Sequence, residues 1–200
     1  MNEEELRNLY VKKKMSSSEI TRIFKCSEHR VNYWLKKYNI SKRSISEAVY
    51  QRCNPKGDPF KVKKIESLAD AKLLGLGLGL YWGEGNKKNK NSVRLGNSNP
   101  LIINNFVRFL IGIFRIKRDR LRFGLQIFGD LSERKVLGFW LKELKEFGIN
   151  KSQFFKVTIT PSRSLGNYRE KLKWGVLTVH FANTKLKNLL DSYIAEVAQW

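Results

Sequence analysis

The segment Ser67–Asn86, SLADAKLLGLGLGLYWGEGN, decides the fold, because small residues recur in it with the period of a helix. Every fourth position carries one of them: Ala71, Gly75, Gly79 and Gly83. Residues four apart lie on one helical face, so they form a stripe. Each glycine costs a helix roughly 1 kcal/mol relative to alanine, and a compensating contact is therefore expected. The stripe fits close packing against a second helix backbone, or a core helix within its own domain.

The predicted helix ends at Gly83-Glu84-Gly85, where Gly85 can stop it. Glu84 therefore lies at the end of the stripe, and no further acidic residue follows until Asp119. A carboxylate followed by a basic segment suits a hard divalent cation bound next to phosphate. The alternative is that the Glu84 side chain is simply solvated.

The charge of the chain points to a polyanionic partner. Its 200 residues carry 39 Lys and Arg against 18 Asp and Glu, a formal net charge of +21. Such an excess favours nucleic acid over an ordinary small-molecule substrate. The longest apolar run, residues 73–83, is shorter than the roughly 20 residues of a membrane span, so no membrane partner is expected. Two cysteines and the absence of a signal-like start predict a cytoplasmic, nucleoid-associated protein.

The first forty residues predict three short helices, the last two joined by a tight turn at residues 25–27. The third, over residues 28–38, buries Val31, Trp34 and Leu35. Its outward face is polar and basic: His29, Arg30, Asn32, Tyr33, Lys36 and Lys37. This pattern is typical of a helix-turn-helix, whose second helix enters the major groove of DNA. The alternative is a small helical bundle used for dimerisation.

The stretch SSSEITRIFKCSEHRVNYWLKKYNI resembles the helix-turn-helix modules of bacterial regulators and of some homing-type nucleases. The turn position that is usually glycine is Lys25 here, and a residue with a side chain is strained there if φ is positive. We therefore predict a helix-turn-helix domain over residues 1–45, a linker over 46–67 with a short helix at 44–52, and a second domain over 68–200.

The second domain resembles the LAGLIDADG family of homing endonucleases. The segment GLGLYWGEG, residues 77–85, follows the family motif, with Gly79 and Gly83 as small residues and Glu84 at its last acid, where Asp is commoner. Predicted strands and helices follow in the family's order: strands at 92–100, 120–128, 154–160 and 174–182, and helices at 100–114, 132–147 and 184–198. The resemblance implies an α+β fold with a curved antiparallel sheet that forms a DNA-binding saddle.

The resemblance also implies a site and an assembly. Two striped helices pack on a two-fold axis through Gly75, Gly79 and Gly83, and each brings one acid, Glu84, to hold Mg²⁺. The chain has one motif, which implies a homodimer on double-stranded DNA. Further catalytic candidates are Asn97 and Asn99, which are alternatively helix caps, and either Lys173 or Lys185. The family's first hairpin, which touches DNA, corresponds to a short basic segment with Lys87, Lys88, Lys90 and Arg94.

The expected function is that of a Mg²⁺-dependent, site-specific DNA endonuclease. The alternative is a non-catalytic helix-turn-helix transcriptional regulator that keeps the same fold, and a third possibility is RNA binding or processing. The carboxylate at Glu84 favours the nuclease, because without a metal it would repel DNA phosphates. Glutamate in place of the commoner aspartate favours the regulator.

Overall fold

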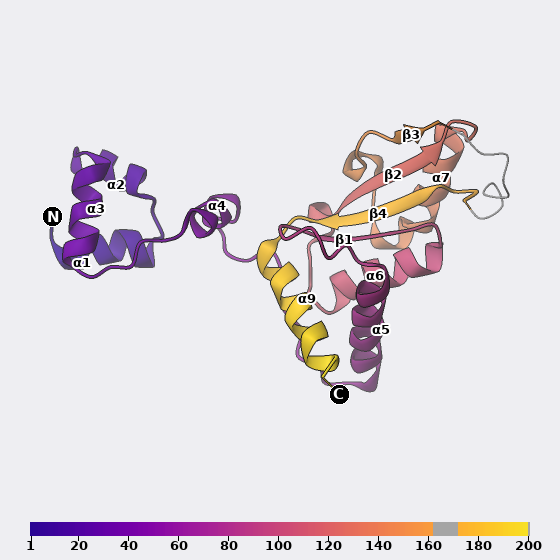
Figure 1. Ribbon diagram of the computed structural model, residues 1–200, viewed down its shortest axis with the longest axis horizontal. Coiled ribbons are helices and arrows are strands. Elements are labelled where there is room, and N and C mark those ends of the chain that lie inside the picture. Colours follow the sequence, from indigo (N-terminus) through magenta and orange to yellow (C-terminus); the bar gives the residue numbers. More distant parts are fainter. Residues whose placement is uncertain (162–171, 200) are drawn as a thin grey trace. The chain divides into compact units, whose positions relative to one another are not determined.

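The computed structural model describes residues 1–161 and 172–199, and the chain forms two compact units, Met1–Pro59 and Phe60–Trp200 (Figure 1). The boundary falls within the segment 46–67 that the sequence predicts as a linker. Each unit has a hydrophobic core of its own. The units are therefore described separately.

The first unit is helical. Its elements are α1 (Glu3–Arg7), the π-helical turn η1 (Asn8–Lys12), α2 (Ser17–Phe24), α3 (Glu28–Lys37) and α4 (Ile45–Cys53). Serine side chains set the helix starts: Ser16 and Ser44 each form a capping box with the glutamate three residues on, and Ser27 accepts the Arg30 N–H. Leu6, Ile20 and Val31 are fully buried where the helices meet.

The turn between α2 and α3 has the left-handed backbone that the helix-turn-helix pattern predicts. Lys25 has φ +47°, and its N–H donates to the Thr21 carbonyl. A side chain in this region of backbone space costs about 1–2 kcal/mol, so the sequence tolerates strain at a position where glycine would have none.

Arg43 ties the end of the first helical segment to α4. Its guanidinium donates to the carbonyl oxygens of Tyr10 (3.0 Å), Lys14 (2.9 Å) and Met15, and to the side chain of Gln51. The guanidinium carbon also lies 4.1 Å from the centre of the Tyr10 ring. Arginine suits this position because its planar group carries several donors in fixed directions.

The second unit is a mixture of helices and strands, which confirms the predicted α+β class. Its helices are α5 (Leu68–Glu84), α6 (Pro100–Gly112), α7 (Glu133–Glu143) and α9 (Thr184–Val197), with 3₁₀ turns η2 (Arg118–Arg120), η3 (Lys145–Phe147) and η4 (Lys151–Gln153). Its strands are β1 (Val93–Asn97), β2 (Arg122–Phe128), β3 (Thr158–Thr160) and β4 (Val176–Phe181). None of the helices within the described residues has the length and apolar character that crossing a bilayer requires.

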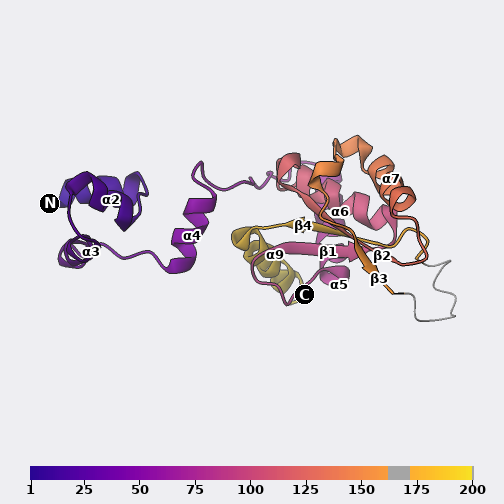
Figure 2. The same cartoon turned by 90° about the horizontal axis from the view of Figure 1, so that it is seen from above.

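The sheet has the order β1-β4-β2-β3, which Figure 1 shows from bottom to top and Figure 2 views from above. It is mixed rather than antiparallel as expected. β4 pairs antiparallel with both β1 and β2, whereas β2 and β3 run parallel. Between β2 and β3 the chain passes through α7. A helical crossover of this kind allows the second strand to run parallel to the first. The strand boundaries expected at 154–160 shorten to Thr158–Thr160.

One face of the sheet packs on the helices, and Figure 1 shows α5, α6 and α9 below the strands. Alternate residues of β2, such as Phe123 and Leu125, are buried with Phe106 of α6. The segment after Pro59 joins the same unit, because the Lys61 N–H donates to the Phe114 carbonyl at 2.9 Å.

α5 packs on α6 through its only fully enclosed glycine. A Cβ atom at Gly77 would lie 2.1 Å from ring carbons of Phe109, well inside van der Waals contact. The glycine is therefore required for the two helices to approach this closely. The buried faces of α5 and α6 continue with Tyr81, whose ring stacks on Phe106 at 6.0 Å.

We expect Gly77→Ala to destabilise the second unit by about 1–3 kcal/mol, because the new methyl group overlaps the Phe109 ring. The matched control is Gly138→Ala in α7, where none of the described residues lies within 4 Å of the new Cβ. This change should raise the free energy of unfolding by about 0.5–1 kcal/mol. Urea unfolding measures both. An equal gain for the two variants would contradict the close α5–α6 contact.

Candidate nucleic-acid interface and metal-binding acid

The small-residue stripe of α5 is exposed. Among the described residues, nothing lies within 4 Å of a Cβ placed at Gly75, Gly79 or Gly83, whereas Gly77 and Tyr81 turn into the core. α5 nevertheless packs within its own domain, on α6 through Gly77, as the alternative of a core helix expects, and it is the stripe alone that faces outward. The exposed side of α5 is also apolar: Leu76 and Trp82 keep 46% and 51% of their surface exposed, and Gly79, Trp82 and Gly83 line a hollow of about 330 Å³.

Glu84 is the last residue of α5 and is exposed. Its carboxylate makes no hydrogen bond or ion pair with the described residues. A negative charge at the C-terminal end of a helix is disfavoured by the helix dipole, by about 0.3–1 kcal/mol. Stability of the fold therefore does not explain the acid at this position, and a bound cation would reverse the sign of the effect.

Lys87 binds the carbonyl groups at the end of α5. Its Nζ donates to the carbonyl oxygen of Tyr81 (2.8 Å) and to that of Trp82. Burial lowers the pKa of Lys87, and Lys187 lowers it further, while Glu84 and Asp191 act in the opposite direction. Lys87 thus supplies the positive charge that the last turn of α5 lacks. Lys87 caps the C-terminal end of α5, and the DNA contact that the sequence predicts for it stays a prediction.

Lys187 is a residue that sequence reasoning missed. It lies on the buried side of α9 with 3% of its side chain exposed, forms an ion pair with Asp191 one turn later, and has its Nζ 5.9 Å from the centre of the Tyr81 ring. Burial and the Asp191 carboxylate raise the pKa of the Tyr81 hydroxyl. A lysine one position after the buried Leu186, with an aspartate at i+4, was the available signal.

The end of α5 leads directly into the sheet. Gly85 forms a bridge with Leu95, and the Asn86 N–H donates to the Arg94 carbonyl at 2.9 Å. The hairpin between α5 and β1 is accordingly short, as the sequence indicates. Glu84 therefore stands beside the strand that carries Arg94.

The sheet face turned away from the helices is polar and basic, and we call it the open face. In register across β1, β4 and β2 it carries one row of Arg94, His180 and Arg122, and a second row of Gly96, Thr178 and Gly124. The four strands contain no acidic residue. A face of this kind, flat along its glycine row and positively charged, suits contact with a phosphate backbone.

His180, for which the sequence analysis predicts no role, lies at the centre of the open face. Its Nε2 would be 3.1 Å from a Cβ at Gly124, and its ring meets the Phe155 ring edge to face at 5.4 Å. Burial lowers the pKa of His180, and the neighbouring Arg94 lowers it further. The imidazole is therefore neutral near pH 7.

The outward face of α3 is largely as predicted. His29, Arg30, Tyr33, Lys36 and Lys37 are exposed, and the Lys37 Nζ lies 4.6 Å from the centre of the Trp34 ring. Asn32 differs from its neighbours: its side-chain oxygen is buried and has no hydrogen-bond partner among the described residues. The sequence pattern therefore places five of the six candidate DNA contacts at the surface of the first unit.

Asn97 and Asn99 serve the start of α6. The Asn99 side-chain oxygen accepts the Leu101 N–H at 2.9 Å, and the Asn97 oxygen accepts the Asn99 N–H at 2.9 Å. The capping role, one of the two interpretations that the sequence left open, is seen for Asn99, while Asn97 binds the N–H of that cap residue. Of the two lysine candidates, Lys173 has its Nζ 5.2 Å from the centre of the Trp174 ring, and Lys185 is exposed on the first turn of α9. Lys88 and Lys90 are exposed between α5 and β1.

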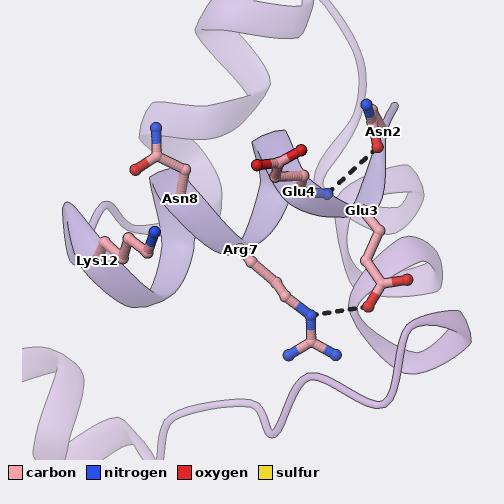
Figure 3. A pocket seen from close by; sticks show the side chains of 6 residues that line it. All are labelled: Asn2, Glu3, Glu4, Arg7, Asn8 and Lys12. Atoms are coloured by element: carbon pink, nitrogen blue, oxygen red, sulfur yellow. Dashed lines mark hydrogen bonds and ion pairs between the residues drawn. The ribbon is translucent and has the colours of Figure 1, made fainter.

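A shallow hollow of about 350 Å³ on the first unit involves none of these residues (Figure 3). Asn2, Glu3, Glu4, Arg7, Asn8 and Lys12 line it. Its polar groups pair locally, since the Arg7 Nε lies 2.8 Å from a Glu3 carboxylate oxygen and the Glu4 N–H donates to Asn2. This hollow is not assigned a role.

Within the described residues, no group of three His, Cys, Asp or Glu side chains gathers closely enough to hold a metal ion. At the end of α5, a single chain offers Mg²⁺ the exposed carboxylate of Glu84. Mg²⁺ is commonly held by one or two carboxylates together with water and substrate phosphates. Glu84 fits part of such a site, which a second chain and a bound phosphate would have to complete.

No protein-family model, curated protein or solved structure matches the chain significantly. The resemblance to the LAGLIDADG family consequently rests on residues 77–85 and on the order of the elements that follow.

We expect the second unit to lose stability as the pH falls from 7.5 to 5.5. The pKa of His180 is lowered in the folded protein from its ordinary 6.5, so unfolding takes up a proton in this range and becomes easier as pH falls. The carboxyl groups with lowered pKa, such as Asp70, titrate below this pH range.

In His180→Gln the free energy of unfolding should depend less on pH than in the wild type. His29→Gln, at an exposed histidine, should keep the wild-type dependence, and urea unfolding at several pH values measures all three. Equal slopes in the wild type and His180→Gln would contradict the shift.

Proposed function

We propose that the protein is a homodimeric, DNA-binding, Mg²⁺-dependent endonuclease that hydrolyses phosphodiester bonds. The observation that carries the proposal is the Glu84 carboxylate, exposed and without a partner among the described residues, at the end of a helix whose small-residue stripe is also exposed. Neither the exposed carboxylate nor the exposed stripe stabilises an isolated chain. In a dimer bound to DNA, the stripe would form the interface and the carboxylate would bind the metal ion.

The stripe supports the dimer. Gly75, Gly79 and Gly83 let another backbone approach closely, and Leu76 and Trp82 beside them offer apolar surface that is in contact with water in the single chain. In a two-fold contact the same patch serves both partners. Gly83 is adjacent to Glu84, so pairing of the stripes brings the two carboxylates close to the axis.

The basic surfaces support DNA as the substrate. Arg94 and Arg122 of the open face would bind phosphates beside the acid, and the exposed side chains of α3 would contact a groove. Bound Mg²⁺ would activate water and stabilise the leaving oxygen. In this proposal Glu84 provides the negative charge that holds the ion, and Lys87 fixes the helix end that carries Glu84.

A non-catalytic regulator of the same design is the second candidate. It is favoured by the side-chain oxygens of Asn97 and Asn99, which are engaged in local hydrogen bonds at the start of α6. It is also favoured by Lys87, whose charge partly offsets that of Glu84 without a metal. In that case the open face and the stripe form a DNA clamp, and α3 supplies the specificity.

We expect the purified protein to be a dimer of about 47 kDa, twice the 23.4 kDa chain. Gly79→Leu should give monomer or aggregate, because the leucine separates the two backbones. Gly138→Leu is the matched control, a leucine at a helical glycine with equally open surroundings, and it should remain dimeric. Sedimentation equilibrium measures the three masses. A monomeric wild type would remove the stripe as an interface.

We expect Glu84→Gln to abolish cleavage while it leaves metal-free DNA binding equal or stronger, since a charge that repels phosphate is gone. In the wild type, Mg²⁺ and Ca²⁺ should both tighten binding, and Ca²⁺ should support little cleavage because of its looser geometry. Glu196→Gln, an exposed glutamate on α9, serves as the control and should behave as the wild type. The measurements are DNA affinity with EDTA, Ca²⁺ and Mg²⁺, and nicking of supercoiled plasmids that carry a library of sites. If the wild type neither binds better with metal nor cuts, the regulator replaces the nuclease.

A further inference from the structure

We propose that the open face binds single-stranded nucleic acid, with the Phe155 ring stacking on an unpaired base. This activity needs neither Glu84, nor the dimer, nor cleavage, so it can fail or hold independently of the endonuclease. It rests on where the chain places Phe155 and on the groups that surround it.

The backbone directs Phe155 to the open face. The Phe155 N–H donates to the Phe123 carbonyl at 2.8 Å, and Phe154 forms a bridge with Phe123. The Phe154 ring stacks on the Phe123 ring at 5.2 Å, on the buried side of the sheet. Successive side chains of an extended strand point to opposite faces. Phe155 therefore emerges on the side of His180.

Gly124 creates the space in which this ring lies. A Cβ at Gly124 would be 3.1 Å from His180 Nε2 and 3.9 Å from a Phe155 ring carbon. Without that atom the two rings meet at 5.4 Å and 83°. The contact holds Phe155 in a defined orientation, yet 50% of its surface remains exposed. The result is a half-exposed aromatic ring on a face whose rows also carry Arg94, Arg122 and Thr178.

The positive charges around Phe155 favour a nucleic acid as the ligand. Arg94 and Arg122 are paired in register with His180 from either side, and the four strands contain no carboxylate. An aromatic ring for a base, with cations beside it for the backbone, is the combination by which single strands are bound. Four-stranded sheets backed by helices are known to present aromatic residues to RNA in this way.

An unpaired base is a better partner for the exposed Phe155 ring than a duplex is. In a duplex the flat faces of the bases are covered by their neighbours, and only the edges are accessible in the grooves. The half-exposed ring of Phe155 can stack on the face of a base, which becomes available when the base is unstacked. A single strand, or an opened region of a duplex, supplies one.

The test uses the full-length protein and a fluorescently labelled 20-mer of deoxythymidine, with affinity measured by anisotropy. Phe155→Ala should weaken binding about 5- to 150-fold, the range that one stacked base contributes. Phe155→Tyr keeps the ring and should stay within about twofold of the wild type. Leu101→Ala removes an exposed apolar side chain of α6 and should also change little. Phe155→Leu, which keeps an apolar side chain, replaces Phe155→Ala if circular dichroism shows that the alanine variant is unfolded.

Two further probes separate stacking from charge. A 20-mer of the same backbone without bases, and a 20-base-pair duplex, should bind the wild type and Phe155→Ala with nearly equal affinity. The proposal is overturned if Phe155→Ala binds the thymidine strand as well as the wild type, or if it loses as much affinity for the abasic strand or the duplex. A 20-mer of uridine distinguishes the source, since the strand that shows the larger loss identifies DNA or RNA as the preferred partner.

Discussion

The contact between Gly77 of α5 and the Phe109 ring of α6 governs the arrangement of the second unit. Successive helical residues are about 100° apart, so a helix held with Gly77 inward must turn Gly75 and Gly79 toward the opposite side. The same contact carries Tyr81 into the core. The exposed stripe and the position of Glu84 are thus consequences of one close approach, and the glycines of α5 serve two different purposes: Gly77 admits the ring within the chain, and the others leave a surface open.

The electrostatics at the end of α5 follow from the same placement. The last turn ends in a glutamate, although a helix C-terminus favours positive charge. Lys87 folds back onto the Tyr81 and Trp82 carbonyls, and the buried Lys187, paired with Asp191, lies 5.9 Å from the centre of the Tyr81 ring. Lys87 therefore stabilises the helix end while the Glu84 carboxylate remains exposed.

Much of this architecture could be predicted from the sequence, because local rules determine it. Ser16, Ser27 and Asn99 identify helix starts through hydrogen bonds that span two or three residues, and the period of the α5 glycines identifies a face. The direction of β3 could not be read in the same way, since it depends on the path of the chain through α7. Arg43 was equally inaccessible, because the carbonyl groups it binds come from residues about 30 positions earlier. Lys87 looked like one of several basic residues until the helix end beside it was known.

The open face shows why composition alone cannot locate a site. The excess of positive charge is spread over both units, yet in the sheet the register concentrates it: Arg94, His180 and Arg122 come from three separate strands and share one row. Burial and Arg94 lower the pKa of the His180 imidazole, so the centre of that row is uncharged at neutral pH while its ends are charged. Because Gly85 bridges to Leu95, the row begins close to Glu84. A nucleic acid bound along the open face would accordingly bring its phosphates toward the one exposed carboxylate that α5 presents.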